Sequence, residues 1–292
     1  MSLDSLLLAH GQASRARGQR PVFGLNGPVG AGKTTLSHQL QQRFAHAGLR
    51  LAVASIDDAY LPLEPRRRAM AGNPFGVLRV PPGSHDPQAL ATPIQAWRQA
   101  ESARLQLPRF DKSLQGGQGD RTTPWIGDAD ALLVEGWMLG CRPLAADLLE
   151  RLLQDPGGLL QGLNAEQRRW LVQCNAALAA YAPLWSQLDQ LIVLWPISWH
   201  WPRRWRFQAE ARQRRRGGAA LEPQALDALV QSSLLSLPPE LYQRPLLQQA
   251  AWVRLLDGRR RVVWEGGGGA NLPEALQPGA LQASSPSSSA TG

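Results

Sequence analysis

Gly27-Pro28-Val29-Gly30-Ala31-Gly32-Lys33-Thr34-Thr35 is the stretch of sequence that decides the fold. It matches the pattern G-x4-G-K-[ST], a loop whose backbone N–H groups surround a phosphate. The apolar segment 21–26 before it predicts a buried strand. After it, Leu36 and Leu40 recur at helical spacing, and Gly48 ends that pattern. Because a strand, a glycine-rich loop and a helix in this order are what phosphate binding requires, we expect all nine loop residues to bind ATP or GTP.

Two side chains of this loop have expected chemical roles. Lys33 is expected to reach the outer phosphates and so to assist catalysis. The hydroxyl of Thr34 is expected to bind Mg²⁺. Lysine is a compact point charge and arginine a planar fork, so the two are not interchangeable in such a loop. The loop therefore predicts a nucleotide and a magnesium ion bound together.

The rest of the chain alternates apolar runs with helical patterns. Three further runs predict buried strands, at 51–56, 131–134 and 191–195. Helical patterns cover 88–101, 143–188 and 199–216. Segments rich in Pro, Gly and polar residues predict long loops at 61–86 and 109–124. The alternation predicts an α/β fold of the P-loop NTPase type, with a parallel sheet covered by helices on both faces.

The chain divides into three parts of unequal length. Residues 1–20 predict a short lead-in helix. Residues 21–265 form the expected phosphate-loop domain, which has a helical lid at about 199–218 and closes with a strand pair at 252–264 around the turn signal Asp257-Gly258. Residues 266–292 begin with a glycine run and end in a serine-rich tail, a low-complexity composition that predicts disorder.

Acidic side chains directly follow two of the predicted strands. Asp57 and Asp58 come after the second strand, and Glu135 comes after the third. The carboxyl ends of parallel strands meet at one edge of the sheet, so these carboxylates are expected beside the phosphate loop. Phosphoryl transfer to an alcohol needs a carboxylate that accepts or orients the hydroxyl proton. We assign that role to Asp57, expect Asp58 to direct Mg²⁺ or the acceptor, and expect Glu135 to anchor Mg²⁺ through water.

The composition excludes several classes of protein. The 292 residues are 43% hydrophobic and 18% charged, too apolar for a disordered chain, and the 28 glycines have no three-residue period. No apolar run approaches the roughly 18 residues of a membrane span, and the N-terminal apolar patch is too short for a signal peptide. Two cysteines, Cys141 and Cys174, are too few for a disulfide framework or a four-thiolate zinc site. We therefore expect a cytoplasmic protein without a membrane partner.

The basic residues are almost all arginines. The chain carries 31 Lys and Arg against 23 Asp and Glu, a net charge of +8, and its only lysines are Lys33 and Lys112. A strongly basic chain indicates either a nucleic-acid partner or a general compositional bias. The uniform preference for arginine favours the second, so no nucleic-acid partner is expected.

Five segments resemble a known family of enzymes. They are SIDDAYLPLEPRRR at 55–68, VPPGSHD at 80–86, RFDKSLQGGQGDR at 109–121, VEGWMLG at 134–140 and WRFQAE at 205–210. Across roughly 20–265 they resemble the D-glycerate 3-kinases of plants and cyanobacteria, which group with phosphoribulokinase, uridine kinase and pantothenate kinase among the P-loop kinases. The resemblance implies a P-loop kinase core with a mobile lid. It also implies Mg²⁺- and ATP-dependent conversion of D-glycerate to 3-phosphoglycerate, the last step of photorespiratory glycolate salvage.

The resemblance implies roles for single residues as well. Asp57 matches the catalytic base of the wider group, and Glu135 matches its Mg²⁺-associated acid. The residues implied to bind the acceptor in the first two segments are Asp58, Tyr60, His85 and Asp86.

A glycerate carboxylate also needs a cationic partner, and the third segment offers two. Arg121 is the preferred bidentate partner, and Lys112 is expected closer to the transferring phosphate. Ala59 stands where the family has an aromatic residue, and Phe110 stands where it has Tyr. A related kinase acting on pantothenate or a nucleoside is therefore an alternative, as is a non-catalytic nucleotide-binding regulator.

The basic segment 199–218 has three competing interpretations. As a lid, it would place Arg206 and Arg212 near the nucleotide, where they stabilise charge on the transferring group, while Trp201 and Trp205 share a packing face. As a nucleic-acid-binding element of a P-loop ATPase, it would use its tryptophans to stack on bases. A merely solvated basic helix is a third possibility. We favour the lid, with a small-molecule substrate as the partner, and the sequence leaves the oligomeric state open.

Overall fold

The computed structural model describes residues 2–215, 217 and 221–277, and its centre is a six-stranded sheet. In spatial order the strands are β2 (Leu51–Ser55), β5 (Ala131–Gly136), β1 (Val22–Asn26), β6 (Gln190–Pro196), β7 (Trp252–Leu256) and β8 (Val262–Gly266). All neighbouring pairs are parallel except β7 and β8 at one edge. The prediction of a mostly parallel α/β sheet is therefore confirmed.

Helices cover both faces of this sheet, because alternate side chains of each strand point to opposite sides. Phe23 and Leu25 of β1 pack into one core with α1 (Leu3–Ala16) and α2 (Lys33–His46). Val22 faces the other core, which α4 (Gln88–Gln99), α6 (Ala165–Ala177) and α7 (Ala182–Trp185) complete. Burial of these two apolar layers is the main force that holds the strands in register. The predicted lead-in helix and the helices after the phosphate loop and at 88–101 are confirmed.

The predicted end of α2 at Gly48 has a clear physical cause. Gly48 has φ +70, a left-handed conformation that glycine adopts without strain. The N–H of Leu49 then turns back to donate to the carbonyl of Phe44 at 2.9 Å, which satisfies a free carbonyl at the helix end. The chain is thereby redirected into β2.

The polar segment 109–124 is not a loop. Its two halves belong to β3 (Arg104–Asp111) and β4 (Asp120–Asp128), which pair antiparallel as a separate two-stranded sheet. Leu105 and Leu107 are fully buried and alternate with exposed polar residues, the pattern of a strand with one solvated face. The glycine-rich stretch 116–119 makes only the tip of this hairpin. The prediction of a loop was wrong because the glycines lie only at the hairpin tip, whereas the residues on either side of them pair as strands.

Some helices were not predicted, and one predicted helical region is divided into several helices. Within the expected loop at 61–86 the chain forms α3 (Leu63–Ala69), whose Pro65 lies in the first turn, where proline is tolerated. The expected helical region at 143–188 consists of α5 (Ala146–Gln154), α6, a 3-10 helix (Leu178–Tyr181) and α7. The basic segment is α8 (Trp201–Arg215), and the chain continues through α9 (Pro223–Leu235), α10 (Pro239–Tyr242) and α11 (Leu246–Gln249).

The C-terminal strand pair is confirmed, with a longer connection than predicted. β7 and β8 pair antiparallel across residues 257–261, where the Asp257 carboxylate accepts from the N–H groups of Arg259 and Arg261. Residues 266–277 were expected to be disordered, but they contain two 3-10 helices (Gly269–Asn271 and Glu274–Leu276), and Leu272 is buried. The rest of that predicted tail, 278–292, lies outside the described residues.

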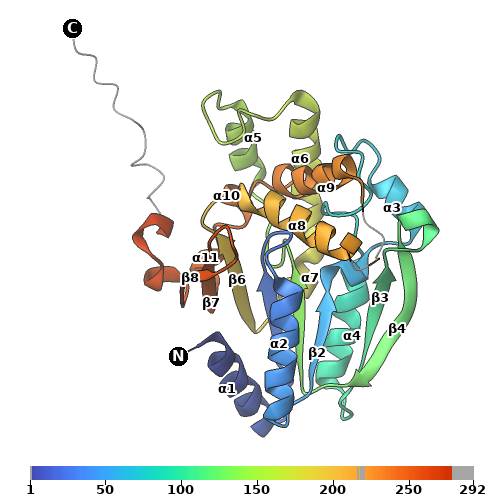
Figure 1. The fold of residues 1–292 in the computed structure, drawn as a ribbon, viewed down its shortest axis with the longest axis vertical. Coiled ribbons are helices and arrows are strands. Elements are labelled where there is room, and N and C mark those ends of the chain that lie inside the picture. Colours follow the sequence, from blue (N-terminus) through green and yellow to red (C-terminus); the bar gives the residue numbers. More distant parts are fainter. Residues whose placement is uncertain (1, 216, 218–220, 278–292) are drawn as a thin grey trace.

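The carboxyl ends of the parallel strands lie under α8 and α9 (Figure 1). Among the described residues, no helix is both long enough and apolar enough to cross a bilayer. In this class of fold ligands bind at the carboxyl ends of the strands, so the region between the sheet and α8 is the place to look for a site.

Candidate active site

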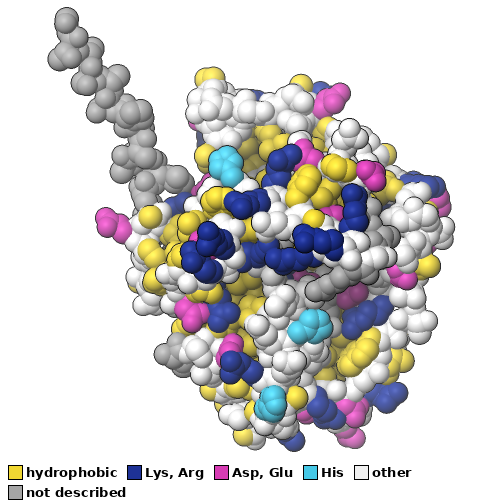
Figure 2. Space-filling model, viewed as in Figure 1, with side chains coloured by type: hydrophobic (Ala, Val, Ile, Leu, Met, Phe, Trp, Pro, Cys, Tyr) yellow, Lys and Arg dark blue, Asp and Glu magenta, His cyan; other side chains and the backbone are white. Residues whose placement is uncertain are grey.

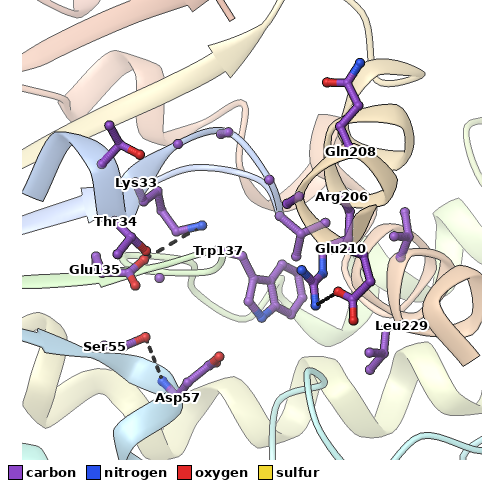
Figure 3. A pocket seen from close by; sticks show the side chains of 18 of the residues that line it. Lys33, Thr34, Ser55, Asp57, Glu135, Trp137, Arg206, Gln208, Glu210 and Leu229 are labelled. Carbon is purple, nitrogen blue, oxygen red and sulfur yellow. Dashed lines mark hydrogen bonds and ion pairs between the residues drawn. The ribbon is translucent and has the colours of Figure 1, made fainter. Parts of the chain in front are cut away.

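A cleft of about 1580 Å³ lies at this edge of the sheet. The phosphate loop from Val29 to Leu36 lines one end, and Asp57 and Glu135 line its floor where β2 and β5 end. Figure 3 shows Lys33, Thr34 and Glu135 at one end, Ser55 and Asp57 below them, and Arg206 and Glu210 opposite, on α8. The expected convergence of the loop with the two carboxylates is therefore present in the structure.

The loop glycines are required by conformation and by contact. Gly32, the residue before α2, has φ +95, and Gly30 has φ +75, both in the left-handed region. A Cβ on Gly30 would lie 2.8 Å from the backbone of Trp205 and Arg206 in α8. The loop therefore curves tightly with α8 packed directly against it, and its N–H groups and the start of α2 suit a phosphate.

Lys33 is held over the loop by its own backbone. Its Nζ donates to the carbonyls of Gly27 at 2.9 Å and Pro28 at 3.2 Å and lies 3.9 Å from Glu135 Oε2. Burial lowers the pKa of Lys33 against the attraction of Glu135. Burial likewise raises the pKa of Glu135 against the attraction of Lys33. The attraction between the two charges thus acts against the desolvation of each.

Thr34 and Glu135 are the side chains that fit a magnesium ion at this end. No group of three or more His, Cys, Asp or Glu is placed to hold a metal anywhere in the described part of the chain. Mg²⁺ is commonly held by one or two protein oxygens with waters and substrate phosphates. A hydroxyl and one carboxylate beside a phosphate loop match that donor set.

Asp57 stands at the start of a 3-10 helix (Ile56–Ala59) that follows β2. The Ser55 hydroxyl accepts from its N–H at 3.2 Å, and its carboxylate Oδ2 lies 2.7 Å from Lys112 Nζ. Burial alone would raise the pKa of Asp57, but the ammonium of Lys112 more than offsets this and holds the pKa well below its usual range. Asp57 is therefore ionised and exposed to the cleft, as a group that accepts a hydroxyl hydrogen bond must be.

Asp58 faces away from the cleft. Its Oδ2 accepts from the Ser55 N–H at 2.9 Å, which completes a capping box on the 3-10 helix, and from Arg109 at 3.0 Å. Burial raises the pKa of Asp58, and these two donors act against that rise. Both donors use this carboxylate to fix the end of β2, and its expected contact with Mg²⁺ or the acceptor stays a prediction.

Tyr60 lines the cleft, whereas His85 lies behind it. The two rings stack with centroids 4.3 Å apart, and His85 Nδ1 is 2.9 Å from the Tyr181 hydroxyl. His85 is 4% exposed, and burial lowers its pKa to about 4. The neutral His85 ring supports Tyr60 from behind. The expected contacts of Tyr60 and His85 with the acceptor stay predictions.

The two cations of the third family segment lie in different surroundings. Lys112 is on the hairpin tip, lines the cleft and reaches Asp57. Arg121, on β4, donates to the carbonyl of Tyr60 and pairs with Asp86 at 3.0 Å. Arg121 and Asp86 are not among the residues that line the cleft. Their mutual pairing leaves the predicted carboxylate contact of Arg121 without direct structural support.

On α8, both predicted arginines line the cleft. Arg206 pairs with Glu210 at 2.9 Å, and Glu210 in turn accepts from the N–H of Leu221. Trp205 is fully buried and donates to the carbonyl of Gly258, so its ring is not presented for stacking on a base. Trp201 packs in the same core, which confirms the shared packing face.

Some cleft residues were not found from the sequence. Figure 2 shows Lys and Arg side chains gathered in a band across one face, over the region where Figure 1 draws α8. The cleft-lining arginines of this region include three beyond α8, namely Arg254, Arg259 and Arg260. Ser55, Arg79 and Trp137 also line the cleft. Ser55 and Trp137 each stand within two residues of a predicted strand-end carboxylate, a signal that could have identified them.

Comparison with known proteins finds kinases that are similar to this chain. No family model matches the chain. It is 32% identical over 220 residues to the chloroplastic D-glycerate 3-kinase of Arabidopsis thaliana, covering 72% of this chain and 45% of that protein. The chain is homologous to D-glycerate 3-kinase. The solved D-glycerate 3-kinase of Cryptococcus neoformans superposes with a TM-score of 0.77 at 26% identity, over 91% of this chain and 99% of that one.

A second relative has no stated acceptor. The uncharacterized kinase mug58 of Schizosaccharomyces pombe is 27% identical over 229 residues, which cover 71% of this chain and 76% of that protein. The chain thus spans less than half of the Arabidopsis glycerate kinase and most of the two fungal proteins.

Proposed function

We propose that this chain transfers the γ-phosphoryl group of ATP to D-glycerate and forms 3-phosphoglycerate, with Asp57 as the general base. One observation carries the proposal: an ionised carboxylate lies across a single cleft from a phosphate loop, in a homologue of D-glycerate 3-kinase. The chemistry follows from this arrangement. ATP supplies the activated phosphoryl group, and Mg²⁺ would offset the negative charge of the phosphates.

Asp57 orients the acceptor hydroxyl in this mechanism. Its carboxylate accepts a hydrogen bond from the hydroxyl and takes the proton as the new O–P bond forms and the bond from the γ-phosphorus to the bridging oxygen of ADP breaks. Lys112 keeps Asp57 ionised by lowering its pKa, and a carboxylate with a lowered pKa is a weak base. A weak base is sufficient, because proton transfer is a small part of a phosphoryl transfer whose transition state is loose.

The cations on both sides of the cleft stabilise the charge that moves. Lys33 donates from the phosphate loop, and Arg206 and Arg212 face the same cleft from α8. Thr34 and Glu135 are the side chains that would hold Mg²⁺. Because Trp205 anchors α8 to the phosphate loop, we propose that lid motion involves the part of the helix that follows Arg206.

The cellular setting is part of the proposal. The resemblance to plant and cyanobacterial enzymes supports a role in photorespiratory glycolate salvage. The two cysteines, Cys141 and Cys174, are both buried free thiols, as in proteins of reducing compartments, which supports a cytoplasmic location. D-glycerate is the proposed partner, and residues 21–265 are the proposed kinase domain.

An acceptor panel tests the function. The purified chain is incubated with Mg²⁺, ATP and D-glycerate, pantothenate or uridine, and ADP release is measured with a coupled assay. We expect the highest kcat/KM with D-glycerate, and phosphorus NMR should identify 3-phosphoglycerate. A different preferred acceptor, or phosphate on the 2-hydroxyl, would contradict the proposal. ATP hydrolysis that single-stranded nucleic acid stimulates in a salt-sensitive manner would favour the nucleic-acid-associated ATPase instead.

A further inference from the structure

Several cations in and around the acceptor end of the cleft already have partners within the protein. The ion pairs there are Lys112–Asp57 at 2.7 Å, Arg109–Asp58 at 3.0 Å and Arg121–Asp86 at 3.0 Å. Arg66 is fully buried and donates to the carbonyls of Leu61, Gln118 and Gly119. Each of these side chains therefore has at least one partner within the protein, although the Nε of Arg66 is buried without one.

Arg79 is different from the cations around it. It lines the cleft at the same end as Asp57 and Tyr60. Its Nη1 is buried from solvent and has no hydrogen-bond partner in the part of the chain that the structure describes. A guanidinium is always charged, and a buried donor on a permanent charge is costly unless something accepts from it. The arrangement calls for an anion that the protein itself does not provide.

The backbone beside Arg79 is fixed in an uncommon conformation. Val80 has φ +95, which is rare for a β-branched residue and costs free energy. Its N–H donates to the Tyr60 hydroxyl at 3.0 Å, and its carbonyl accepts from Trp137 Nε1 at 3.2 Å. Two aromatic side chains of the cleft thus hold the segment in place. Strain that surrounding groups maintain in this way is typical of positions that present a functional side chain.

A second guanidinium lies within electrostatic reach of Arg79. Burial, and after it the charge of Arg79, lower the pKa of Arg66. Two like charges in a part-buried wall repel each other, and the carbonyls bound to Arg66 do not neutralise Arg79. A negative group on a bound molecule would relieve this repulsion.

We propose that Arg79 binds the carboxylate of the molecule that is phosphorylated, next to the hydroxyl held by Asp57. The planar fork of a guanidinium pairs with a carboxylate through two parallel hydrogen bonds. The identification of that molecule as D-glycerate rests on the proposed function, whereas the requirement for an acidic acceptor rests on Arg79. The role that the sequence suggested for Arg121 passes to Arg79, because Arg121 is neutralised by Asp86 and lies outside the cleft lining.

The test compares an acid with its neutral isostere. Acceptor KM, ATP KM and kcat are measured with D-glycerate and D-glyceramide for the wild type, Arg79→Gln, Arg79→Lys, Arg121→Gln and Arg68→Gln, with melting temperature as the folding control. Arg68 is an exposed arginine on the nearby α3 and serves as the matched control. Arg79→Lys keeps the charge and loses the fork, so it remains informative if the glutamine variant is unstable.

We expect the wild type to prefer the acid over the amide by about 100-fold in kcat/KM, the size of a buried charged hydrogen bond. Arg79→Gln should lose most of that preference through a higher KM for D-glycerate, with unchanged values for D-glyceramide and ATP. Arg79→Lys should lose part of it, and Arg68→Gln none.

Four results would overturn the inference. They are an Arg79→Gln enzyme that keeps its preference for the acid, equal losses on acid and amide, a rise confined to the KM for ATP, and a selective loss in Arg121→Gln instead. If the wild type accepts neither compound, the proposed function fails, and the same variants are assayed with the acceptor that the panel identifies and its charge-matched or neutral counterpart. Selective loss on the acid in Arg79→Gln then supports the inference, and a wild type that works equally well on neutral acceptors contradicts it.

Discussion

The two ends of the cleft each hold one of the chain's two lysines, and they are built in opposite ways. The phosphate end comes from nine consecutive residues, and Lys33 is held there by carbonyls of the same loop, with 12% of its side chain exposed. The acceptor end is assembled from four separate segments, and Lys112 extends from a hairpin tip with 59% of its side chain exposed. One lysine is fixed by its own motif, and the other by a carboxylate 55 residues away.

The difference teaches where specificity can change. A phosphate loop needs glycines at positive φ and a lysine of one length, so substitutions there disturb the shared chemistry. The acceptor wall depends on pairings between distant side chains, such as Asp57 with Lys112 and Arg121 with Asp86. Pairings of that kind can be exchanged one at a time while the loop keeps its function.

The largest effect is expected at Asp57, which lines the cleft between the phosphate loop and the acceptor wall. Asp57→Asn removes the carboxylate that orients the acceptor hydroxyl and takes its proton, so kcat should fall by roughly 10² to 10⁴ fold, with the KM for ATP nearly unchanged. Steady-state kinetics with D-glycerate measure both. Turnover close to that of the wild type would remove Asp57 from the role of base.

The neighbouring carboxylate supplies the control for this measurement. Asp58→Asn weakens a capping box and an ion pair with Arg109, so it should cost about 1 kcal/mol of stability, with a much smaller loss of kcat. A thermal melt and the same kinetic assay separate the two aspartates. A collapse of kcat in Asp58→Asn without a fall in melting temperature would show that it contacts the reacting groups.

The next effect in size is expected at the phosphate end. Lys33→Arg keeps the charge, but a longer fork does not fit between the loop carbonyls, so kcat/KM for ATP should fall by about 100-fold. Calorimetric titration with ADP shows whether binding is lost as well. Full activity in this variant would refute the idea that the loop requires a point charge.

The smallest effect is expected at the acceptor end. Lys112→Arg can still pair with Asp57 from an exposed hairpin, and exposed pairs contribute little, so kcat/KM should stay within about 10-fold of the wild type. The same assay as for Lys33→Arg gives the comparison directly. Equal losses in the two variants would mean that the hairpin lysine is as tightly constrained as the loop lysine, and the contrast between the two ends would disappear.

The sequence predicted those features that depend on neighbours along the chain. The phosphate loop, the strand before it and the helix ended by Gly48 follow from local patterns, and so do the carboxylates at the ends of β2 and β5. The resemblance to glycerate kinases placed Lys112 on a segment that does reach the cleft. In each case one short stretch contains all the information that the prediction needs.

Features that depend on distant pairing were missed. The β3–β4 hairpin was read as a loop, and the parallel pairing of β7 with β6 has no local signature. The ion pair of Asp58 with Arg109 joins residues 51 positions apart, so no local pattern indicates it. Arg79 stands out only when every neighbouring cation is seen to have a partner, which requires the whole acceptor wall.

The scarcity of lysine gives the protein an unusual chemical property. Reagents that acylate amines find only two lysine side chains in 292 residues, and both of them line the cleft. Lys112 is the accessible one, whereas Lys33 is mostly enclosed. Among the lysine side chains, a label introduced under mild conditions is therefore directed to Lys112 beside Asp57, and its rate of attachment, separated from that of the α-amino group by peptide mapping, reports on that ion pair without any engineered residue.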